Sequence, residues 1–280
     1  MDHQRVAFVT GASSGIGRAT AQLLAQRGFR VFGTSRQPEP DASLAYAMLP
    51  LDVRSEESVR AAVRAVLDQA GRIDVVVNNA GYGQFGALEE NTIAEAQAQF
   101  DTNVFGALRV IQAVVPIMRR QGSGRIISTS SVLGQVAPPF VGLYAGSKFA
   151  LEGLSESLRA ELRPFGIHVS LVEPGFVKSS FVDKGPTHPL AAYDTQRLVA
   201  TAFARQGLAN GLDPNEVARL IVRVATARNP GLRYRAGRSS SLLIVLKRLL
   251  PEALFELVTR RAFQPSTPAL ASRKTSPRAA

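Results

Sequence analysis

Short apolar runs alternate along the chain with longer stretches in which apolar residues recur every three or four positions. Buried strands are predicted at 5–10, 30–34, 49–53, 73–77, 125–131 and 167–172, with 232–237 as a candidate last strand. The stretches between them have helical periodicity, as where Val59, Ala62, Val63 and Val66 share one face. Strands alternating with helices indicate parallel pairing. The pattern therefore predicts an α/β domain whose doubly wound sheet of about seven parallel strands has helices on both faces.

The first run leads into a glycine-rich turn and then into a helical stretch. Glycines let the backbone approach a pyrophosphate, and a helix N-terminus offers N–H groups and a positive dipole end. The spacing is Gly-x-x-x-Gly-x-Gly rather than the older Gly-x-Gly-x-x-Gly, but the strand–turn–helix context is the one that a dinucleotide site requires. A turn without a ligand is the alternative. The residues expected to bind the dinucleotide are Gly11, Ser13, Ser14, Gly15, Ile16 and Gly17.

The second run ends at Ser35-Arg36, 19 residues after Gly17, where a carboxylate would bind the adenosine ribose of NAD. No Asp or Glu occurs at positions 34 to 37. The guanidinium of Arg36 could instead bind a 2′-phosphate through two hydrogen bonds. The sequence therefore favours NADP(H), with a merely solvated arginine as the alternative.

Tyr144 and Lys148 lie four positions apart, in a stretch predicted to be helical from about Gly142, and would share one helix face. A phenol with a pKa of about 10 is a poor acid or base at neutral pH, and an adjacent ammonium favours the phenolate. Ser131 lies thirteen residues before the tyrosine, at the end of a predicted strand, and could bring its hydroxyl beside the phenol. Such tyrosine–lysine pairs also arise by chance on many helices, so this one gains meaning only from the rest of the chain.

Composition and charge narrow the range of functions. The 280 residues include no Cys and three scattered His, which indicates no disulfide, no thiol nucleophile and no metal site. No apolar run reaches the roughly 18 residues that span a bilayer, and no signal peptide precedes the first strand, so we expect a cytoplasmic protein. The net charge is +11, and residues 228–280 hold 11 Lys/Arg against 2 Asp/Glu. This basic end lacks the aromatic platform or motif of a nucleic-acid site.

Taken together, the motifs over about residues 5 to 240 resemble the short-chain dehydrogenase/reductase family. The matched positions are, in chain order, Thr10 to Gly17, Arg36, Asp52-Val53, Asn78-Asn79-Ala80-Gly81, Asn103, Ser131, Tyr144, Lys148 and Pro174-Gly175. The resemblance implies further cofactor contacts from Asp52, Val53, Asn79, Ala80, Gly81, Tyr144, Lys148, Pro174, Gly175, Val177 and Ser179. Ser179 stands where the family usually has a threonine, and it keeps the hydroxyl.

The resemblance implies hydride transfer between a nicotinamide and a carbonyl or alcohol carbon. Tyr144 would exchange a proton with the substrate oxygen, and Ser131 would hold that oxygen, with Ser130 as the fallback. Lys148 would lower the tyrosine pKa and bind the nicotinamide ribose. Asn103 would hold a water that links the lysine to solvent. That role would also explain an asparagine inside the helix predicted over 97–115, where this residue is locally unfavourable.

Two segments rich in apolar and aromatic side chains, 133–141 and 176–193, are candidates for the substrate pocket. We expect Val141 and Phe181 to contact the substrate together with Ser131 and Tyr144, and we expect a lipophilic ketone or alcohol. For any one of these apolar residues, packing in the core is an equally good explanation. The run from Thr187 to Leu190 suggests a mobile lid.

The chain is expected to consist of a Rossmann-fold domain (1–238), an amphipathic helical extension (239–263) and a disordered tail (264–280). The extension resembles that of hydroxysteroid and retinol dehydrogenase-like members. It could cap the substrate pocket, which we favour, pack against another subunit of a homo-oligomer, or contact an anionic membrane surface.

The sequence predicts an NADP(H)-dependent carbonyl reductase or alcohol dehydrogenase. A non-catalytic NADP(H) sensor or scaffold is one alternative, although it would have no chemical need for an intact Asn, Ser, Tyr and Lys set. A ketoreductase for carrier-bound acyl groups is another. The basic C-terminus could attract an acidic carrier, but the hydrophobic extension fits this alternative less well.

Overall fold

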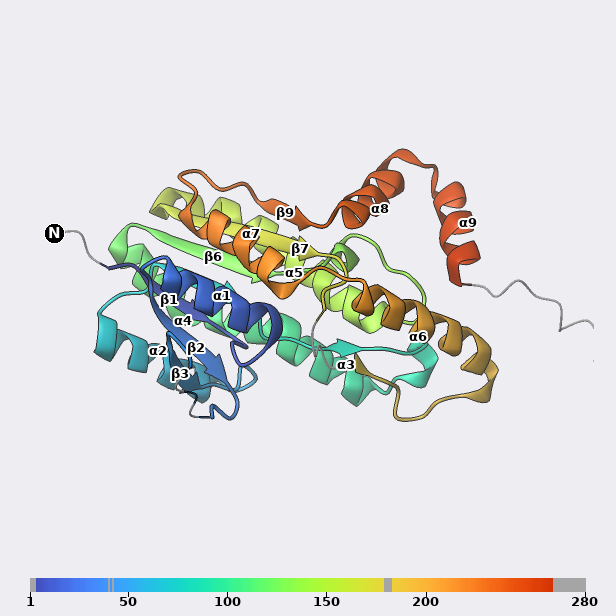
Figure 1. The fold of residues 1–280 in the computed structure, drawn as a ribbon, viewed down its shortest axis with the longest axis horizontal. Coiled ribbons are helices and arrows are strands. Elements are labelled where there is room, and N and C mark those ends of the chain that lie inside the picture. Colours follow the sequence, from blue (N-terminus) through green and yellow to red (C-terminus); the bar gives the residue numbers. More distant parts are fainter. Residues whose placement is uncertain (1–3, 40, 42, 179–182, 264–280) are drawn as a thin grey trace, which may run out of the picture.

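The structure is a computed structural model that describes residues 4–39, 41, 43–178 and 183–263. Its middle layer is a seven-stranded sheet in the order β3-β2-β1-β4-β6-β7-β9, and every neighbouring pair is parallel (Figure 1). The strands are β1 (Val6–Val9), β2 (Arg30–Ser35), β3 (Ala47–Pro50), β4 (Val75–Asn78), β6 (Gly124–Thr129), β7 (Ile167–Pro174) and β9 (Arg233–Ala236). The predicted doubly wound parallel sheet is confirmed.

Helices cover both faces of the sheet because successive residues of its buried strands point to opposite sides. The helices are α1 (Gly15–Gln26), α2 (Glu56–Ala70), α3 (Ile93–Phe100), α4 (Gly106–Gln121), α5 (Gly142–Leu162), α6 (Asp194–Ala209), α7 (Pro214–Thr226), α8 (Arg238–Leu249) and α9 (Glu252–Phe263). Phe8 and Val76 pack with α2 and α4, whereas Val9 and Val77 pack with α1 and α7. Figure 1 shows α1 and α7 side by side on the near face.

Local signals explain where several helices begin and end. The hydroxyl of Ser55 accepts a hydrogen bond from the N–H of Ser58 and caps α2, which ends at Gly71 with φ 69°. Helix α7 begins with Asp213 as its cap and a proline in its first turn. These residues satisfy the N–H groups that a helix start leaves unpaired, so the predicted starts of α2 and α7 are confirmed.

Four features differ from the sequence prediction. The third strand is Ala47–Pro50 rather than 49–53, and the helix predicted over 97–115 is divided by a π-helical turn at Asp101–Phe105. A two-stranded sheet pairs β5 (Gly83–Gln84) with β8 (Asp183–Lys184), far apart in the sequence. Helix α6 was not predicted either, and it lacks a periodic apolar face because its one buried residue is Ala200.

Helices α8 and α9 extend beyond the end of the sheet, at the upper right of Figure 1. Ile244 of α8 is buried against Val132 and Val136, so the extension packs directly after the strand end that carries Ser131. No helix of the described residues is long and apolar enough to cross a bilayer. The tail predicted to be disordered, 264–280, lies outside the described residues.

Candidate active site

The carboxyl ends of the central strands bring residues from distant parts of the sequence to one edge of the sheet. Gly11 follows β1, Asn79 follows β4, Ser131 closely follows β6 and Gly175 follows β7. The chain order of the strands reverses between β1 and β4. Ligands of doubly wound sheets bind outside such a reversal, so this edge is the candidate site.

The glycine turn is held closely against the end of β4. The side-chain amide of Asn79 donates to the carbonyl oxygens of Thr10 (3.2 Å) and Gly11 (3.1 Å), and the hydroxyl of Thr10 accepts from the N–H groups of Asn79 and Ala80 at 3.0 Å. A Cβ on Gly17 would lie 2.1 Å from the carbonyl oxygen of Gly11. This glycine therefore permits the close contact between turn and helix.

The start of α1 is chemically suited to an anion. Ser14, its cap residue, makes no side-chain capping bond, and the first turn contains no acid. The first N–H groups of a helix are left without intrahelical partners, and the helix dipole favours negative charge there. The predicted glycine motif thus lies where a pyrophosphate can be bound.

The end of β2 carries an exposed cation and a hydroxyl without a hydrogen-bond partner in the described part of the chain. Arg36 is exposed and makes no ion pair within the described part of the chain, and the hydroxyl of the neighbouring Ser35 is buried without a hydrogen-bond partner there. Asp52, which the resemblance assigns to the adenine, accepts hydrogen bonds from Arg54, the shortest at 2.6 Å. Bonding to Arg54 lowers the pKa of Asp52.

Tyr144 and Ser131 are brought together as predicted. Ser131 begins a short helical turn, and its hydroxyl accepts a bond from the N–H of Leu133 at 3.1 Å. Tyr144 lies in the first turn of α5 and is hydrogen-bonded to Ser131 through its side chain. Burial raises the pKa of Tyr144 to about 12, while the bond to Ser131 acts in the opposite direction.

Lys148 lies one turn further along α5, with only 6% of its surface exposed. Its ammonium donates to the carbonyl oxygen of Thr129 at 2.8 Å and lies 5.6 Å from the ring centroid of Tyr144. Burial lowers the pKa of Lys148 to about 8, and the carboxylate of Glu152 opposes that shift. The pKa of Tyr144 is thus raised rather than lowered overall, because burial is the largest influence on it.

Asn103 is 2% exposed and lies in the π-helical turn. Its amide nitrogen donates to the carbonyl of Tyr82 (3.0 Å) and to the hydroxyl of Ser147 (3.1 Å), while its oxygen accepts from the N–H of Tyr82 (3.1 Å). π-Turns within helices often occur at functional sites. The asparagine therefore connects the chain before β5 to the residue that precedes Lys148.

One aromatic side chain stacks on the Tyr144 ring, and a second aromatic pair lies in the segments that precede α5 and α6. The ring of Phe85 stacks on that of Tyr144 at 6.4 Å and 14°, and Phe140 meets Tyr193 edge to face at 6.2 Å. Phe140 has φ 65°, a strained conformation for a residue with a side chain. The sequence analysis missed Phe85, which follows a strand of two residues and so belongs to no periodic pattern.

Other predicted site residues are placed at the same edge or lie outside the description. Val141 is half-buried and caps α5, immediately before the turn that carries Tyr144. Val177 is buried and forms a bridge with Leu212. Ser179 and Phe181 lie outside the described residues.

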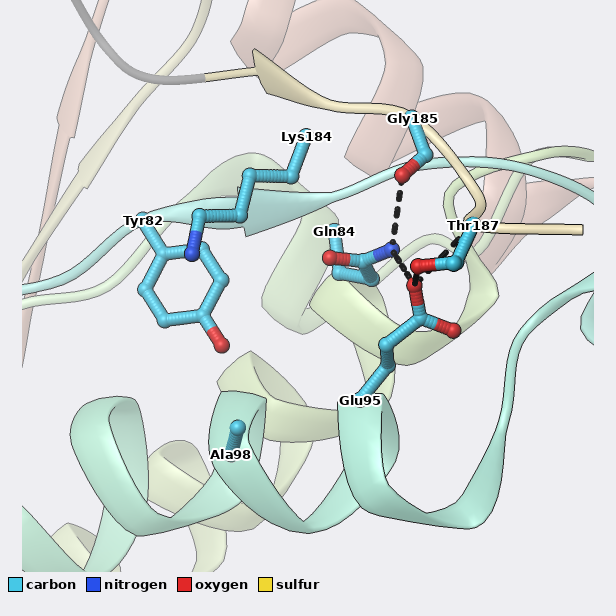
Figure 2. Close-up of a pocket in the computed structure, with 7 residues that line it drawn as sticks. All are labelled: Tyr82, Gln84, Glu95, Ala98, Lys184, Gly185 and Thr187. Carbon is cyan, nitrogen blue, oxygen red and sulfur yellow. Dashed lines mark hydrogen bonds between the residues drawn. The ribbon is translucent and has the colours of Figure 1, made fainter.

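A cavity of about 420 Å³ lies on the other side of β5 (Figure 2). Its lining residues are Tyr82, Gln84, Glu95, Ala98, Lys184, Gly185 and Thr187. The Glu95 carboxylate accepts from the hydroxyl (2.5 Å) and the N–H (3.1 Å) of Thr187, and the amide of Gln84 donates to the carbonyl of Gly185 at 3.1 Å. Bonding to Thr187 lowers the pKa of Glu95 to about 2.

Buried Glu90 is hydrogen-bonded to the same segment three residues further along the chain, at Leu190. Its carboxylate accepts from the N–H groups of Leu190 and Ala87, both at 2.9 Å, and from the guanidinium of Arg197. The stretch predicted as a lid, Thr187–Leu190, is thus bonded at both ends to carboxylates near α3.

Comparison with known proteins agrees with this geometry. The sequence profile of a family described as short chain dehydrogenase matches residues 5–188. A 3-ketodihydrosphingosine reductase of Bacteroides thetaiotaomicron is 37% identical over 261 residues, which are 91% of this chain and 97% of that protein. The 17-beta-hydroxysteroid dehydrogenase type 1 of Mus musculus is 41% identical over 251 residues, 82% of this chain and 72% of that protein.

Solved structures share the fold. A short-chain dehydrogenase from Streptomyces avermitilis superposes with a TM-score of 0.81 at 33% identity, covering 93% of this chain and 97% of its own. A short chain dehydrogenase/reductase from Burkholderia phymatum, in complex with NAD, gives 0.77 at 26% identity, covering 88% and 93%. An alcohol dehydrogenase from Thermococcus sibiricus, complexed with 5-hydroxy-NADP, gives 0.70 at 26% identity, covering 84% and 96%.

Proposed function

Because the chain belongs to the short-chain dehydrogenase family, we propose that it is an NADP(H)-dependent oxidoreductase that interconverts a carbonyl and a hydroxyl group in a lipophilic substrate. The observation that carries this proposal is the bond between Ser131 and Tyr144 beside buried Lys148, at the sheet edge where the glycine turn begins α1. A nicotinamide dinucleotide bound there supplies or accepts the hydride.

The residues present fit such a dinucleotide. The uncapped start of α1 suits the pyrophosphate, and the close approach of Gly11 to β4 leaves that helix end open. Arg36 and the unpartnered hydroxyl of Ser35 suit a phosphate on the adenosine ribose, which favours NADP(H) over NAD(H). Relatives solved with NAD and with an NADP derivative show that the fold accepts both.

Ser131 and Tyr144 would together bind the reacting oxygen of the substrate. In reduction, the phenol would donate its proton to the alkoxide oxygen that forms as the carbon gains a hydride; in oxidation the proton would return. An alkoxide is a stronger base than a phenolate, so a phenol with a pKa of about 12 can still supply the proton. The ammonium of Lys148, 5.6 Å from the ring centroid, would stabilise the phenolate left behind.

Asn103 would act as a positioning residue. Its bonds to Tyr82 and Ser147 hold the first turns of α5 in place relative to β5. The water-holding role implied by the family resemblance stays a prediction.

Two observations support a lipophilic substrate. Phe85 stacks on the ring of Tyr144, and Phe140 and Val141 immediately precede the helix that carries it, so the reacting oxygen would sit near aromatic and apolar groups. The relatives named for a ketodihydrosphingosine and for a 17-beta-hydroxysteroid are named for lipophilic compounds.

The proposal is tested by titrating the protein with NADPH and NADH, followed by NADPH oxidation with ketones and aldehydes from small to steroid-sized. We expect tighter binding of NADPH and turnover with bulky apolar carbonyls. Tight NADPH binding without turnover across the panel would favour the sensor alternative.

The variant Arg36→Gln tests the cofactor preference. A hydrogen bond to a charged group contributes about 1.5–3 kcal/mol, so the Kd for NADPH should rise about tenfold or more while that for NADH stays unchanged. Arg27→Gln, which removes an exposed arginine at the other end of α1, is the control. Equal effects on both cofactors would contradict the assignment of Arg36.

A further inference from the structure

Helix α8 presents an apolar face outward, and its exposed Lys247 and Arg248 lie to either side of the face that packs on the domain. Leu242, Val245 and Leu249 are 59%, 40% and 76% exposed, and their spacing of three and four positions places them on one side of the helix. A surface helix of a globular protein normally has the opposite arrangement, with polar groups toward solvent. The order of residues in α8 therefore requires a reason beyond packing within this chain.

The side of α8 that faces the domain makes specific contacts with it. Ile244 is 1% exposed and packs against Val132 and Val136. The ammonium of Lys247 donates to the backbone oxygen of Gln135, and the guanidinium of Arg248 donates to its side-chain oxygen at 3.2 Å. These bonds fix the rotation of the helix, so the exposure of its apolar face is a consequence of specific contacts.

Helix α9 also exposes large apolar side chains. Leu254 and Leu257 are 44% and 40% exposed, whereas Phe255 packs inward toward Ile244. Five large apolar side chains are thus exposed on two consecutive helices at one end of the molecule (Figure 1). Exposed apolar groups that cluster in this way mark a surface that binds a partner or a membrane.

The charge of the following sequence identifies the partner. Residues 258–280 hold five Lys/Arg and no Asp/Glu. An apolar surface followed by a basic segment is the combination that anchors a protein on an anionic bilayer, because each signal alone gives only weak binding. A symmetric contact between two copies would instead bring two such basic segments together, and their repulsion would oppose it.

We propose that α8 and α9 form a membrane-contact surface. The leucines and Val245 would enter the boundary between headgroups and acyl chains, and the basic segment 258–280 would bind anionic headgroups. Since Ile244 packs on Val132, the residue after Ser131, the candidate active site would lie close to the bilayer. The proposal does not depend on which reaction the site performs.

Co-sedimentation of the full chain with lipid vesicles tests the proposal. We expect binding to phosphatidylcholine vesicles that contain phosphatidylserine, and much weaker binding without the anionic lipid or in high salt. The double variant Leu242→Ser/Leu249→Ser should lower partitioning about tenfold or more, because two exposed leucines lose their apolar transfer energy. Ile93→Ser is the matched control, since Ile93 is 75% exposed on α3.

A second measurement covers the case in which the double variant does not fold. The chain has no cysteine, so Leu249→Cys can be labelled with a polarity-sensitive fluorophore at one site, with Ile93→Cys as the control. Anionic vesicles should shift the emission of the first label to shorter wavelength and leave the second unchanged. No binding to either vesicle, or equal binding by the folded double variant, would overturn the proposal. So would lipid-independent dimers that the double variant dissociates.

Discussion

Two polar clusters, one buried and one partly exposed, flank the short strand β5, and they differ in how completely their groups are hydrogen-bonded. Around Lys148, the hydroxyl of Ser130 and one oxygen of Glu152 lack partners within the described residues. Across the strand, the carboxylates of Glu90 and Glu95 accept hydrogen bonds from backbone and side chains of the segment that follows β8. Figure 2 shows the bonds of Glu95.

The pKa values follow this difference. Hydrogen bonds hold the pKa of Glu95 at about 2 and favour its charged form, whereas burial moves Tyr144 to about 12 and Lys148 to about 8, which favours their neutral forms. A carboxylate that accepts several hydrogen bonds keeps its charge, while an incompletely bonded buried charge costs stability and stays available for chemistry. This comparison supports the proposal that the Lys148 side is the reacting side, and Glu90 and Glu95 hold the segment that follows β8.

The largest effect should come from Tyr144→Phe. Removing the phenolic hydroxyl should lower kcat about 10²–10⁴-fold, the usual contribution of a general acid or base, while the Kd for NADPH stays nearly unchanged. Tyr82→Phe is the matched control, because Tyr82 lines the cavity on the other side of β5. Near-normal turnover by the Tyr144 variant would remove this residue from the proposed role.

The next largest effect should be on the free energy of unfolding, from Lys148→Met, and it should be greatest below pH 8. The lysine has a pKa of about 8 in the fold against an ordinary value of 10.5. Between these values the unfolded chain binds more protons, so the stability contributed by this group rises with pH in that window and is lowest below pH 8. The shift corresponds to about 3 kcal/mol at most.

Urea unfolding of both proteins from pH 7 to pH 10 measures that contribution. We expect the difference in unfolding free energy between the wild-type protein and Lys148→Met to shrink as the pH rises. Parallel curves over this range would show that the lysine has an ordinary pKa in the folded protein.

Much of this organisation could be predicted from the sequence because its signals are local. The ends of β1, β4 and β6 meet at one edge in any parallel sheet, so Gly11, Asn79 and Ser131 had to converge once the strands were recognised. The spacing of Tyr144 and Lys148 on one helix face was predictable for the same reason. Ser55 and Pro214 likewise indicated helix starts without reference to distant residues.

What the sequence did not predict depends on contacts between distant segments. The pairing of Gly83 with Asp183 joins strands of two residues each, too short to carry a periodic pattern. The raised pKa of Tyr144 comes from burial by the surrounding fold, and Asp52 takes Arg54 as an ion-pair partner. Neither burial nor partner choice can be read from residue spacing.

A smaller effect is expected from Glu90→Gln, in the cluster whose carboxylates are hydrogen-bonded. The Glu90 side chain is fully buried and carries the negative charge that Arg197 faces. Losing that charge leaves buried groups incompletely paired, and the unfolding free energy should fall by about 1–3 kcal/mol. The neighbouring Glu89→Gln is the control: among the described residues its carboxylate accepts a hydrogen bond from the exposed hydroxyl of Tyr193 alone, so its change should stay within about 0.5 kcal/mol. Equal losses measured by urea unfolding would contradict the special role of Glu90.

The smallest effect concerns the pH dependence of Glu95. Its pKa is about 2 in the fold against an ordinary 4.5, so its stabilising contribution is complete above the ordinary value and is lost as the pH falls toward 2. The carboxylate is half-exposed, and solvent screening should keep the contribution below about 1 kcal/mol. Thr187→Val removes the largest cause of the shift, so its destabilisation relative to the wild-type protein should be measurable at pH 6 and should diminish by pH 3. An equal loss of stability at pH 6 and pH 3 would show that the hydroxyl of Thr187 acts independently of the charge on Glu95. The segment that follows β8 would then be held by packing rather than by this carboxylate.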